Sequence, residues 1–299
     1  MLSENTRRWI ESMTGARVLS VAVMRGATSS LLHAVEIESD AGRHSLVLRR
    51  FVNGEWVRRE PDVAVREAVS LQHGTRAGLP VPELIAFDRD GTHCGVPATL
   101  VSRIPGTVVL EPTDQMTWLR GLAQSAARVH RVDAAGFRWK YRRYNDAQPL
   151  AVPNWSKQRE AWKKVIEIVD GPVRSYSESF IHRDYHPSNV LWQDGRISGV
   201  VDWVNGCRGP AGIDVAWCRH NLASLHGVSA ADGFLAAYIA EAGSEFEYDP
   251  YWDLMSVVEL LPGPPSMYEG WRAAGVAAIS NTLMRARVDD YVESVVARL

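Results

Sequence analysis

The sequence lacks several features that mark whole classes of protein. No apolar run reaches 18 residues, so no transmembrane helix is expected. The first residues, MLSENTRRWIESM, are polar and lack the apolar core of a secretory signal peptide. There are no internal repeats and no low-complexity segments. We therefore expect a globular protein of the cytoplasm that has no membrane partner.

Cysteine and lysine are both scarce. The 3 cysteines, Cys94, Cys207 and Cys218, are too few and too scattered for a disulfide framework. Cys207 and Cys218 do not have the spacing of zinc ligands with His220, so we expect all three cysteines to be packing residues. Only 4 lysines stand against 29 arginines, and the first lysine is Lys140. If a function in the first 139 residues requires a cationic side chain that other proteins supply with lysine, this chain must supply it with arginine.

The remaining composition is that of an ordinary globular chain. Of the 299 residues, 46% are hydrophobic and 23% are charged, and the formal net charge is −2. This length predicts two lobes or domains. The near-neutral charge balance gives no basic patch for nucleic acid, so no such partner is expected. The oligomeric state cannot be read from the sequence.

Residues 1–101 predict a small α+β lobe. Period-two patterns and turn residues predict strands over 17–24, 31–38 and 44–51, a helix from Pro61 to Gly74, and strands around 84–87 and 98–102. The last two strands are joined by a turn at Asp90-Gly91. The change of character after Pro105-Gly106 places the boundary between the lobes near residues 102–106.

Residues 107–299 predict a larger, mostly helical lobe. Helices are predicted over 114–131 and from about 154 to 169, with a looser basic stretch between them. Asp194-Gly195 is a strong hairpin signal between two short strands. The chain after the hairpin is predicted to be helical up to Leu299.

The stretch FIHRDYHPSNVLW, residues 180–192, places polar side chains where a core strand should be. If Asp194-Gly195 forms the turn, Asn189 lies opposite Val200, and Asp202 is its diagonal neighbour. Diagonal neighbours lie about 7–8 Å apart, so two oxygen-bearing side chains there can share Mg²⁺. Asp184 precedes them, and a base beside a magnesium site is what phosphoryl transfer needs.

Two other interpretations of this stretch remain open. His182 and Asp184 could merely hydrogen-bond the turn, while Asn189 and Asp202 cap strands. His182, Asp184 and His186 stand on alternate residues and could instead be ligands of a metal hydrolase. A second histidine cluster, which a metal hydrolase would need, is missing.

The motif HRDYHPSN, followed by GVVDWVNGCRGPAGIDVAW, resembles the loop and the magnesium segment of the aminoglycoside phosphotransferase family. These are small-molecule kinases with a protein-kinase-like fold. The resemblance implies a two-lobed α+β fold, with an antiparallel-sheet N-lobe that has one main helix and a larger helical C-lobe. It implies that Asp184 is the catalytic base and that Asn189 and Asp202 hold Mg²⁺. His182 and Asp214 would be structural residues near the site.

Protein kinases share part of this motif but differ in the segment that follows. Asp202 is followed by Trp203-Val204, and only twelve residues separate Asp202 from Asp214. No Ala-Pro-Glu follows, so there is no room for an activation segment that docks a peptide. We therefore expect a small-molecule acceptor.

The resemblance also implies nucleotide contacts in the first lobe. The turn from Arg25 to Ser30 takes the phosphate-covering position with one glycine, and the hydroxyls of Thr28 and Ser29 would donate to phosphate oxygens. The segment ATLVSRIPG resembles the hinge, where the Ser102 carbonyl and the Ile104 amide would meet the purine of ATP or GTP.

An arginine must replace the lysine that kinases carry on their third strand. The strand LVLRRF offers Arg49 or Arg50, and alternation puts Arg49 on the side of Val47. Arginine grips phosphate bidentately, so the exchange is compatible with activity. The predicted helix supplies Glu67 as its partner, and Glu60 is the runner-up.

The segment from His220 to Trp271 suggests the acceptor. It contains no lysine or arginine but eight carboxylates. Six of these are predicted to bind an amine-bearing acceptor such as an aminoglycoside antibiotic: Glu241, Glu245, Asp249, Asp253, Glu259 and Glu269. The other interpretation is a solvated acidic face.

We therefore predict a Mg²⁺-dependent phosphotransferase that moves the γ-phosphoryl group of ATP or GTP to a hydroxyl of a small molecule. A metabolic kinase that resembles choline or sugar kinases is the alternative enzyme. A nucleotide-binding pseudokinase is the alternative from another class, suggested by the missing lysine and the single-glycine turn.

Overall fold

The computed structural model describes residues 2–24, 30–144, 149–261, 263–277 and 279–299. The chain divides into two compact units. Unit 1 consists of Met1–Gly106 and Ser198–Gly206, and unit 2 consists of Thr107–Ile197 and Cys207–Leu299. The sequence gives no sign that Ser198–Gly206 groups with the N-terminal unit.

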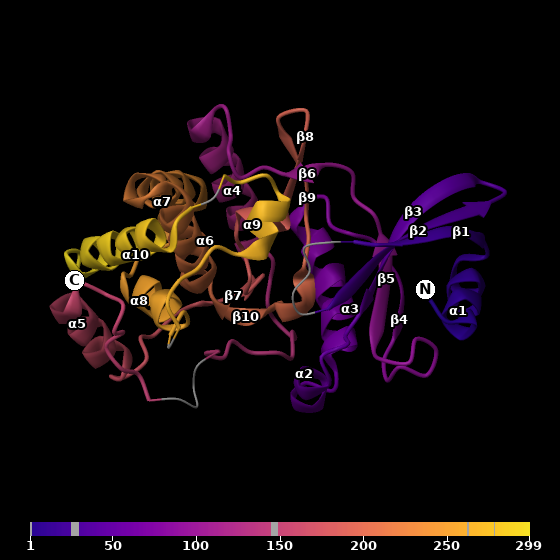
Figure 1. The fold of residues 1–299 in the computed structure, drawn as a ribbon, viewed down its shortest axis with the longest axis horizontal. Coiled ribbons are helices and arrows are strands. Elements are labelled where there is room, and N and C mark those ends of the chain that lie inside the picture. Colours follow the sequence, from indigo (N-terminus) through magenta and orange to yellow (C-terminus); the bar gives the residue numbers. More distant parts are fainter. Residues whose placement is uncertain (1, 25–29, 145–148, 262, 278) are drawn as a thin grey trace. The chain divides into compact units, whose positions relative to one another are not determined.

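Unit 1 is built on an antiparallel sheet. Its elements are α1 (Glu4–Thr14), β1 (Arg17–Val23), β2 (Leu31–Ser39), β3 (Gly42–Arg50), α2 (Gly54–Arg59), α3 (Val63–Gly74), η1 (Thr75–Ala77), β4 (Leu84–Asp88), β5 (Ala98–Ser102) and η3 (Trp203–Asn205). In the described part of the unit, five strands pair in the order β1-β2-β3-β5-β4 (Figure 1). The strands and the main helix agree with the sequence prediction.

The side chains of strand β3 alternate between the two faces of this sheet, and different helices cover the two faces. Leu46 and Leu48 are buried in one core cluster with Trp9 and Ile10 of α1. Arg49 points to the opposite face, where it meets α3. This is the alternation that a pleated strand imposes, and it places a cation between the sheet and the main helix.

Two turns predicted from the sequence have the backbone that their residues favour. Gly91 has φ 86°, and a Cβ there would lie 2.7 Å from the backbone of Val96, so only glycine fits. Asp194 and Gly195 both have positive φ, 51° and 72°, which is the pattern of a type I′ hairpin turn. This turn joins β8 (Val190–Gln193) to β9 (Arg196–Val200).

The sequence prediction missed two helices of unit 1. Helix α1 begins where Ser3 Oγ accepts the N–H of Thr6 at 3.1 Å, and it ends at Gly15, which has φ 63°. These are ordinary capping signals at both ends of the helix. Helix α2 has 6 residues and begins at Asn53, whose side chain accepts two backbone N–H groups.

Unit 2 is mostly helical. Its elements are β6 (Thr107–Val108), α4 (Gln115–His130), α5 (Arg159–Val169), β7 (Glu178–Ile181), η2 (Pro187–Asn189), β8, β10 (Cys207–Pro210), α6 (Ala211–His226), α7 (Val228–Ala242), η4 (Gly243–Glu245), α8 (Tyr251–Val258), α9 (Glu269–Ala273) and α10 (Asn281–Val296). Helix α6 packs against α7, α8 and α10, and β7 pairs with β10 (Figure 1). Helix α6 therefore runs through the core of this unit.

Helix α5 begins later than predicted, at Arg159 rather than near Asn154. Just before it, Ser156 Oγ and the Lys157 N–H donate to the carboxylate of Asp289, at 2.5 and 2.8 Å. These tertiary hydrogen bonds use the segment before α5 as a connection to α10 and prevent an earlier start of the helix.

The three cysteines are buried, as packing residues should be. Burial, reinforced by Asp88, raises the pKa of the Cys94 thiol to about 12. Within the described ranges of the chain, no helix is long and apolar enough to cross a bilayer.

Candidate active site

A buried carboxylate holds the start of the loop between β7 and η2. Asp214, in the first turn of α6, accepts the N–H of His182 on Oδ2 at 2.7 Å and the N–H of Arg183 on Oδ1 at 2.8 Å. His130 Nε2 lies 3.2 Å from Oδ2. The loop is therefore fixed by its backbone, whatever its side chains bind.

Asp214 stays ionised although it is buried. Burial alone would raise its pKa, but the hydrogen bond and charge of His130, followed by His182, lower the pKa below its ordinary value. His130 is oriented in turn by Tyr238, whose hydroxyl lies 2.6 Å from Nδ1. The structural role predicted for Asp214 matches these contacts.

The loop brings Asp184 and Asn189 together. Asn189 Nδ2 donates to the backbone oxygen of Asp184 at 2.9 Å, and it lies 3.3 Å from Asp184 Oδ2. His186 Nε2 lies 3.5 Å from Asp184 Oδ1. The side chain of Asp184 is 26% exposed, so its carboxylate can be reached by a substrate.

Aromatic side chains of unit 2 complete the surroundings of Asp184. Tyr185 is buried and donates to the backbone oxygen of Leu122 in α4 at 2.7 Å. Trp217 of α6 donates its indole N–H to Asp184 Oδ1 at 3.0 Å. The sequence prediction missed Trp217, although it follows Asp214 by one helical turn.

Arg183 is also held tightly. Its guanidinium lies 3.8 Å from the ring centre of Tyr144 and 4.9 Å from that of Tyr141. Its Nη2 donates to Glu259 Oε1 at 2.6 Å, and both side chains are at most 2% exposed. Burial opposes the charge of Arg183, but Tyr144 and Glu259 outweigh it and raise the pKa. Arg183 therefore fastens the loop to the end of α8.

This pairing corrects the prediction for Glu259. The carboxylate expected to bind the acceptor is buried against Arg183 and is not available to a ligand. Burial also raises its pKa, against the opposing effect of Arg183. Arg183 lies outside the lysine- and arginine-free segment, so the charge pattern of that segment could not reveal this partner.

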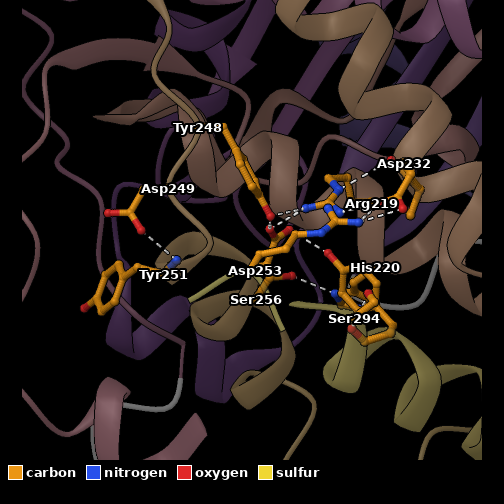
Figure 2. Close-up of polar contacts among 12 residues, drawn as sticks. Arg219, His220, Asp232, Tyr248, Asp249, Tyr251, Asp253, Ser256 and Ser294 are labelled. Atoms are coloured by element: carbon orange, nitrogen blue, oxygen red, sulfur yellow. Dashed lines mark hydrogen bonds and ion pairs between the residues drawn. The ribbon is translucent and has the colours of Figure 1, made fainter. Parts of the chain in front are cut away.

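Asp253 requires the same correction. It is 1% exposed and forms an ion pair with the buried Arg219 (Figure 2). It also accepts hydrogen bonds from Tyr248 at 2.5 Å and from Tyr291 at 2.6 Å. Figure 2 shows Asp232 on the other side of the guanidinium, 2.9 Å from Nη2. Asp253 is thus part of the core of unit 2.

The other four predicted acceptor carboxylates do not form one described cluster. Glu241 accepts from Gln124, Asp249 accepts the N–H of Tyr251, and Glu269 lies 3.4 Å from Arg272. The side chain of Glu245 lies outside the described atoms. The prediction that these six carboxylates bind the acceptor is therefore wrong for at least the two buried residues, Asp253 and Glu259.

In unit 1 the central group is Arg49. Its Nη1 lies 2.5 Å from Glu67 Oε1, its Nη2 lies 2.7 Å from Asp202 Oδ1, and its Nε donates to Ser30 Oγ at 2.9 Å. Burial opposes the charge, but Asp202 and Glu67 outweigh it and raise the pKa of Arg49. The ion pair expected between Arg49 and Glu67 is present. Arg50 points away and donates to the backbone oxygen of Cys94.

Of the two carboxylates predicted as partners of Arg49, Glu67 lies on α3 and Glu60 lies before it. Glu67 is 5% exposed, and its second oxygen accepts from Thr99 at 2.5 Å. Glu60, the runner-up, instead binds Arg66 at 3.0 Å. Arg66 also donates to the backbone oxygens of Asn205 and Gly206, which fixes the segment after Asp202.

Asp202 has an unusual backbone conformation. Its φ is 67° and its ψ is 57°, in the left-handed region that non-glycine residues rarely adopt. The following Trp203 is fully buried and donates its indole N–H to the Val200 oxygen at 2.8 Å. A Cβ on Gly74 would lie 3.1 Å from the Trp203 ring, so α3 and η3 pack closely. The tryptophan after Asp202 therefore anchors it.

The residues predicted to hold Mg²⁺ suit a hard cation by their chemistry. Arg49, Glu67 and Asp202 together carry one excess negative charge, which an added cation would balance. Asn189 Nδ2 is directed at Asp184, which leaves the amide oxygen as the group able to bind a metal. Asp202 supplies a carboxylate, and oxygen ligands are those that Mg²⁺ prefers.

The remaining predicted nucleotide contacts are only partly described. Thr28 and Ser29 lie outside the described residues. Ser102 ends β5 opposite Leu46, and its hydroxyl accepts the N–H of Glu83 at 2.8 Å. Ile104 lies against β9, because a Cβ on Gly199 would meet it at 2.6 Å. Their roles in binding a nucleotide stay predictions.

The metal-hydrolase interpretation gains no support. Within the described ranges, no group of three or more His, Cys, Asp or Glu side chains is arranged to hold a metal ion. His182 instead accepts the N–H of Asp184 on Nδ1 at 3.3 Å. This contact suits the structural role predicted for His182.

Unit 1 is an antiparallel sheet with one main helix, and unit 2 is a helical unit whose loop is held by Asp214. This combination defines the class of kinase-like phosphotransferases. The chain belongs to the APH phosphotransferase enzyme family, whose model matches residues 28–274. Among curated proteins, a homoserine kinase from Phenylobacterium zucineum is 28% identical over 191 residues. The match covers 56% of this chain and 56% of that protein, so the chain spans little more than half of the relative's length.

Solved structures share the fold. A thermostable mutant of aminoglycoside phosphotransferase APH(4)-Ia, in a ternary complex with AMP-PNP and hygromycin B, has a TM-score of 0.63 at 16% identity and covers 98% of this chain and 99% of its own. Amicoumacin kinase hAmiN, with AMP-PNP and Ca²⁺, has a TM-score of 0.58 at 14% identity, over 93% and 88%. The α+β, kinase-like fold expected from the sequence is confirmed.

Replacing Asp253 should destabilise the chain severely. Asp253→Ala leaves the buried Arg219 with only the half-exposed Asp232 as a carboxylate partner, which should cost about 3 kcal/mol or more in the free energy of unfolding. Asp249→Ala is the matched control, because it loses only the hydrogen bond from the Tyr251 N–H, at about 1 kcal/mol. Urea unfolding compares the two variants. Similar small losses would contradict the core role of Asp253.

Stability in mild acid should depend on His220. Burial, followed by the charge of His186, lowers its pKa from 6.5 to about 3. Between these values the unfolded chain binds a proton that the folded chain does not. The free energy of unfolding should therefore fall as pH drops, by up to about 1.4 kcal/mol per pH unit from this group. Urea unfolding between about pH 7 and pH 4 should give a shallower fall for His220→Gln, and equal slopes would refute the assignment.

Proposed function

We propose that this chain is a magnesium-dependent phosphotransferase that moves the γ-phosphoryl group of ATP or GTP to a hydroxyl of a small molecule. The observation that carries the proposal is the loop held by Asp214, in which Asp184 lies beside Asn189 with part of its carboxylate exposed. A reachable carboxylate next to an oxygen ligand is the arrangement that phosphoryl transfer requires.

In this mechanism Asp184 orients the acceptor hydroxyl and takes its proton. Asn189 and Asp202 would hold Mg²⁺, which when bound would neutralise charge on the transferred group. Arg49 offers phosphate oxygens the second N–H of Nη1 and of Nη2, which its contacts with Glu67 and Asp202 leave over, in the place of the usual lysine. Glu67 and Ser30 keep that fork oriented. The hinge residues Ser102 and Ile104 are proposed to meet the purine through their backbone.

The acceptor is proposed to carry an amine as well as a hydroxyl. The curated relative is a homoserine kinase, and the solved structure of APH(4)-Ia contains hygromycin B. Homoserine and hygromycin B both carry amino and hydroxyl groups. The burial of Asp253 and Glu259 removes part of the argument for a polycationic antibiotic. A metabolic kinase acting on a small amino alcohol is therefore the second candidate.

A transfer assay distinguishes these candidates. The chain is incubated with Mg²⁺ and γ-labelled ATP or GTP, and with L-homoserine, choline or hygromycin B as the acceptor. Label on hygromycin B supports an antibiotic kinase, whereas label on L-homoserine or choline supports a metabolic kinase. A chain that binds nucleotide but neither labels an acceptor nor hydrolyses ATP above background would be a pseudokinase.

Asp184→Asn should lower kcat by about 10²–10⁴, because general-base catalysis is lost. Nucleotide affinity should stay within a few-fold, whereas Asp202→Asn should weaken binding of the Mg²⁺-nucleotide. Steady-state kinetics and calorimetric titration measure the two effects. Asp194→Asn makes the same chemical change in the hairpin turn and should leave both unaltered. Near-normal turnover by Asp184→Asn would eliminate the base assignment.

Arg49→Ala should damage nucleotide use far more than Arg50→Ala. The two residues are adjacent on β3 but face opposite sides of the sheet, and only Arg49 contacts Glu67 and Asp202. Arg49→Lys should be partly active, since a lysine also carries the charge. The KM for ATP is the measurement, and circular dichroism checks that each variant folds. If the two alanine variants behave alike, the face assignment is wrong.

A further inference from the structure

We infer that Trp217 is a positioning residue that acts through Asp184, and this inference rests on the function proposed above. The indole N–H of Trp217 donates to Asp184 Oδ1 at 3.0 Å. A donor from α6 therefore reaches the side chain of the proposed base directly. Trp217 itself touches neither reactant in this role.

The position of Trp217 on α6 explains how one helix controls the loop. Asp214 and Trp217 are three residues apart, so their side chains lie on the same face of the helix. Asp214 accepts the backbone N–H groups of His182 and Arg183, and Trp217 binds the side chain of the next residue, Asp184. One turn of α6 thus fixes three consecutive loop residues.

The hydrogen bond selects one orientation of the carboxylate. The terminal torsion of an aspartate side chain is broad, so an unsupported carboxylate rotates easily. Oδ1 accepts the shorter hydrogen bond, from Trp217 at 3.0 Å, and also lies 3.5 Å from His186 Nε2. Oδ2 accepts the longer hydrogen bond, from Asn189 Nδ2 at 3.3 Å, and is the less strongly engaged oxygen. Oδ2 is therefore assigned as the oxygen that takes the proton of the acceptor hydroxyl. The proton moves from that hydroxyl to Oδ2 as the phosphorus–oxygen bond to the acceptor forms and the bond to the nucleotide breaks.

The indole is itself held in place. Its ring packs edge to face with Tyr144 at 6.1 Å and with His220 at 4.9 Å between ring centres. His220 is buried and bound to Ser256 at 2.7 Å, and its low pKa keeps it uncharged at neutral pH. Asn221 Nδ2 donates to the Trp217 backbone oxygen at 2.9 Å. A donor that is fixed in this way can orient the base without a cost in side-chain entropy at each turnover.

The kinetic test removes the N–H but keeps an aromatic ring. Trp217→Phe should lower kcat by about 10- to 100-fold while the KM for ATP changes less than about threefold, since only orientation is lost. Transfer from γ-labelled ATP is followed to L-homoserine and, in parallel, to water. An isosteric benzothienylalanine at position 217, in which sulfur replaces the N–H, should show the same loss if Phe packs poorly.

Trp162→Phe is the matched control. Trp162 also donates its indole N–H to an aspartate of unit 2, Asp289, at 3.3 Å. This change should lower the thermal midpoint and leave kcat within about twofold. A comparable loss of kcat in both variants would indicate a general effect of destabilisation and would overturn the inference.

A double-mutant cycle separates this inference from the proposed function. If Trp217 acts through Asp184, Trp217→Phe should cause no further loss of kcat in the Asp184→Asn background. If Asp184→Asn loses its activity and Trp217→Phe keeps the kcat of the unchanged chain, the role of Trp217 fails and the role of Asp184 stands. If Asp184→Asn is fully active, the proposed function fails and the positioning role fails with it.

The hydrogen bond can also be observed without any acceptor. In ¹⁵N-tryptophan-labelled protein, Asp184→Ala should shift the indole N–H signal of Trp217, assigned by its absence in Trp217→Phe. The signals of Trp162 and Trp203 should stay in place, because their acceptors are Asp289 and the Val200 oxygen. An unmoved Trp217 signal would show that the contact is not made in solution.

Discussion

The hydrogen bonds from two successive backbone N–H groups to the carboxylate of Asp214 are the interaction on which unit 2 depends. Burying a charged group is costly unless it is fully paired, and here His182, Arg183 and His130 supply the partners. The same contacts fix the loop that carries Asp184. The burial of Asp214 therefore both stabilises the core of the unit and sets the position of Asp184, the proposed base.

Unit 1 solves a comparable problem with a cation. Arg49 contacts Glu67, Asp202 and Ser30 with its three nitrogens, which a planar guanidinium does without rearrangement. A lysine has one nitrogen on a flexible stem and would hold the same three partners less rigidly. The scarcity of lysine in this chain thus does not leave the position on β3 without a cation. At this position the planar guanidinium of Arg49 stands in the place of a lysine ammonium group.

The features that could be predicted from the sequence are those that depend on a local pattern of residues. The period-two alternation of β3 identified Arg49 rather than Arg50, and Asp-Gly pairs located two turns, because these signals act over a few residues. The prediction of an acidic acceptor-binding surface was wrong for Asp253 and Glu259, because the partners of a charged residue need not be close in sequence. Arg219 stands directly before the arginine-free segment and Arg183 far before it, yet they neutralise Asp253 and Glu259. Only tertiary structure decides whether a carboxylate is a surface group or a core group.

Each unit contains a non-glycine residue with left-handed backbone next to, or at, an aspartate that is proposed to act in phosphoryl transfer. Arg183 has φ 68° and Asp202 has φ 67°, a conformation that costs about 1–2 kcal/mol for such residues. Such strain persists only where the surroundings determine it. Arg183 is held by Asp214 and Glu259, and Asp202 is held by Arg49 and the buried Trp203 next to it. In each unit, therefore, an ion pair made by a buried arginine stabilises a strained backbone turn that carries an aspartate: Asp184 follows the strained residue in one unit, and Asp202 is the strained residue in the other.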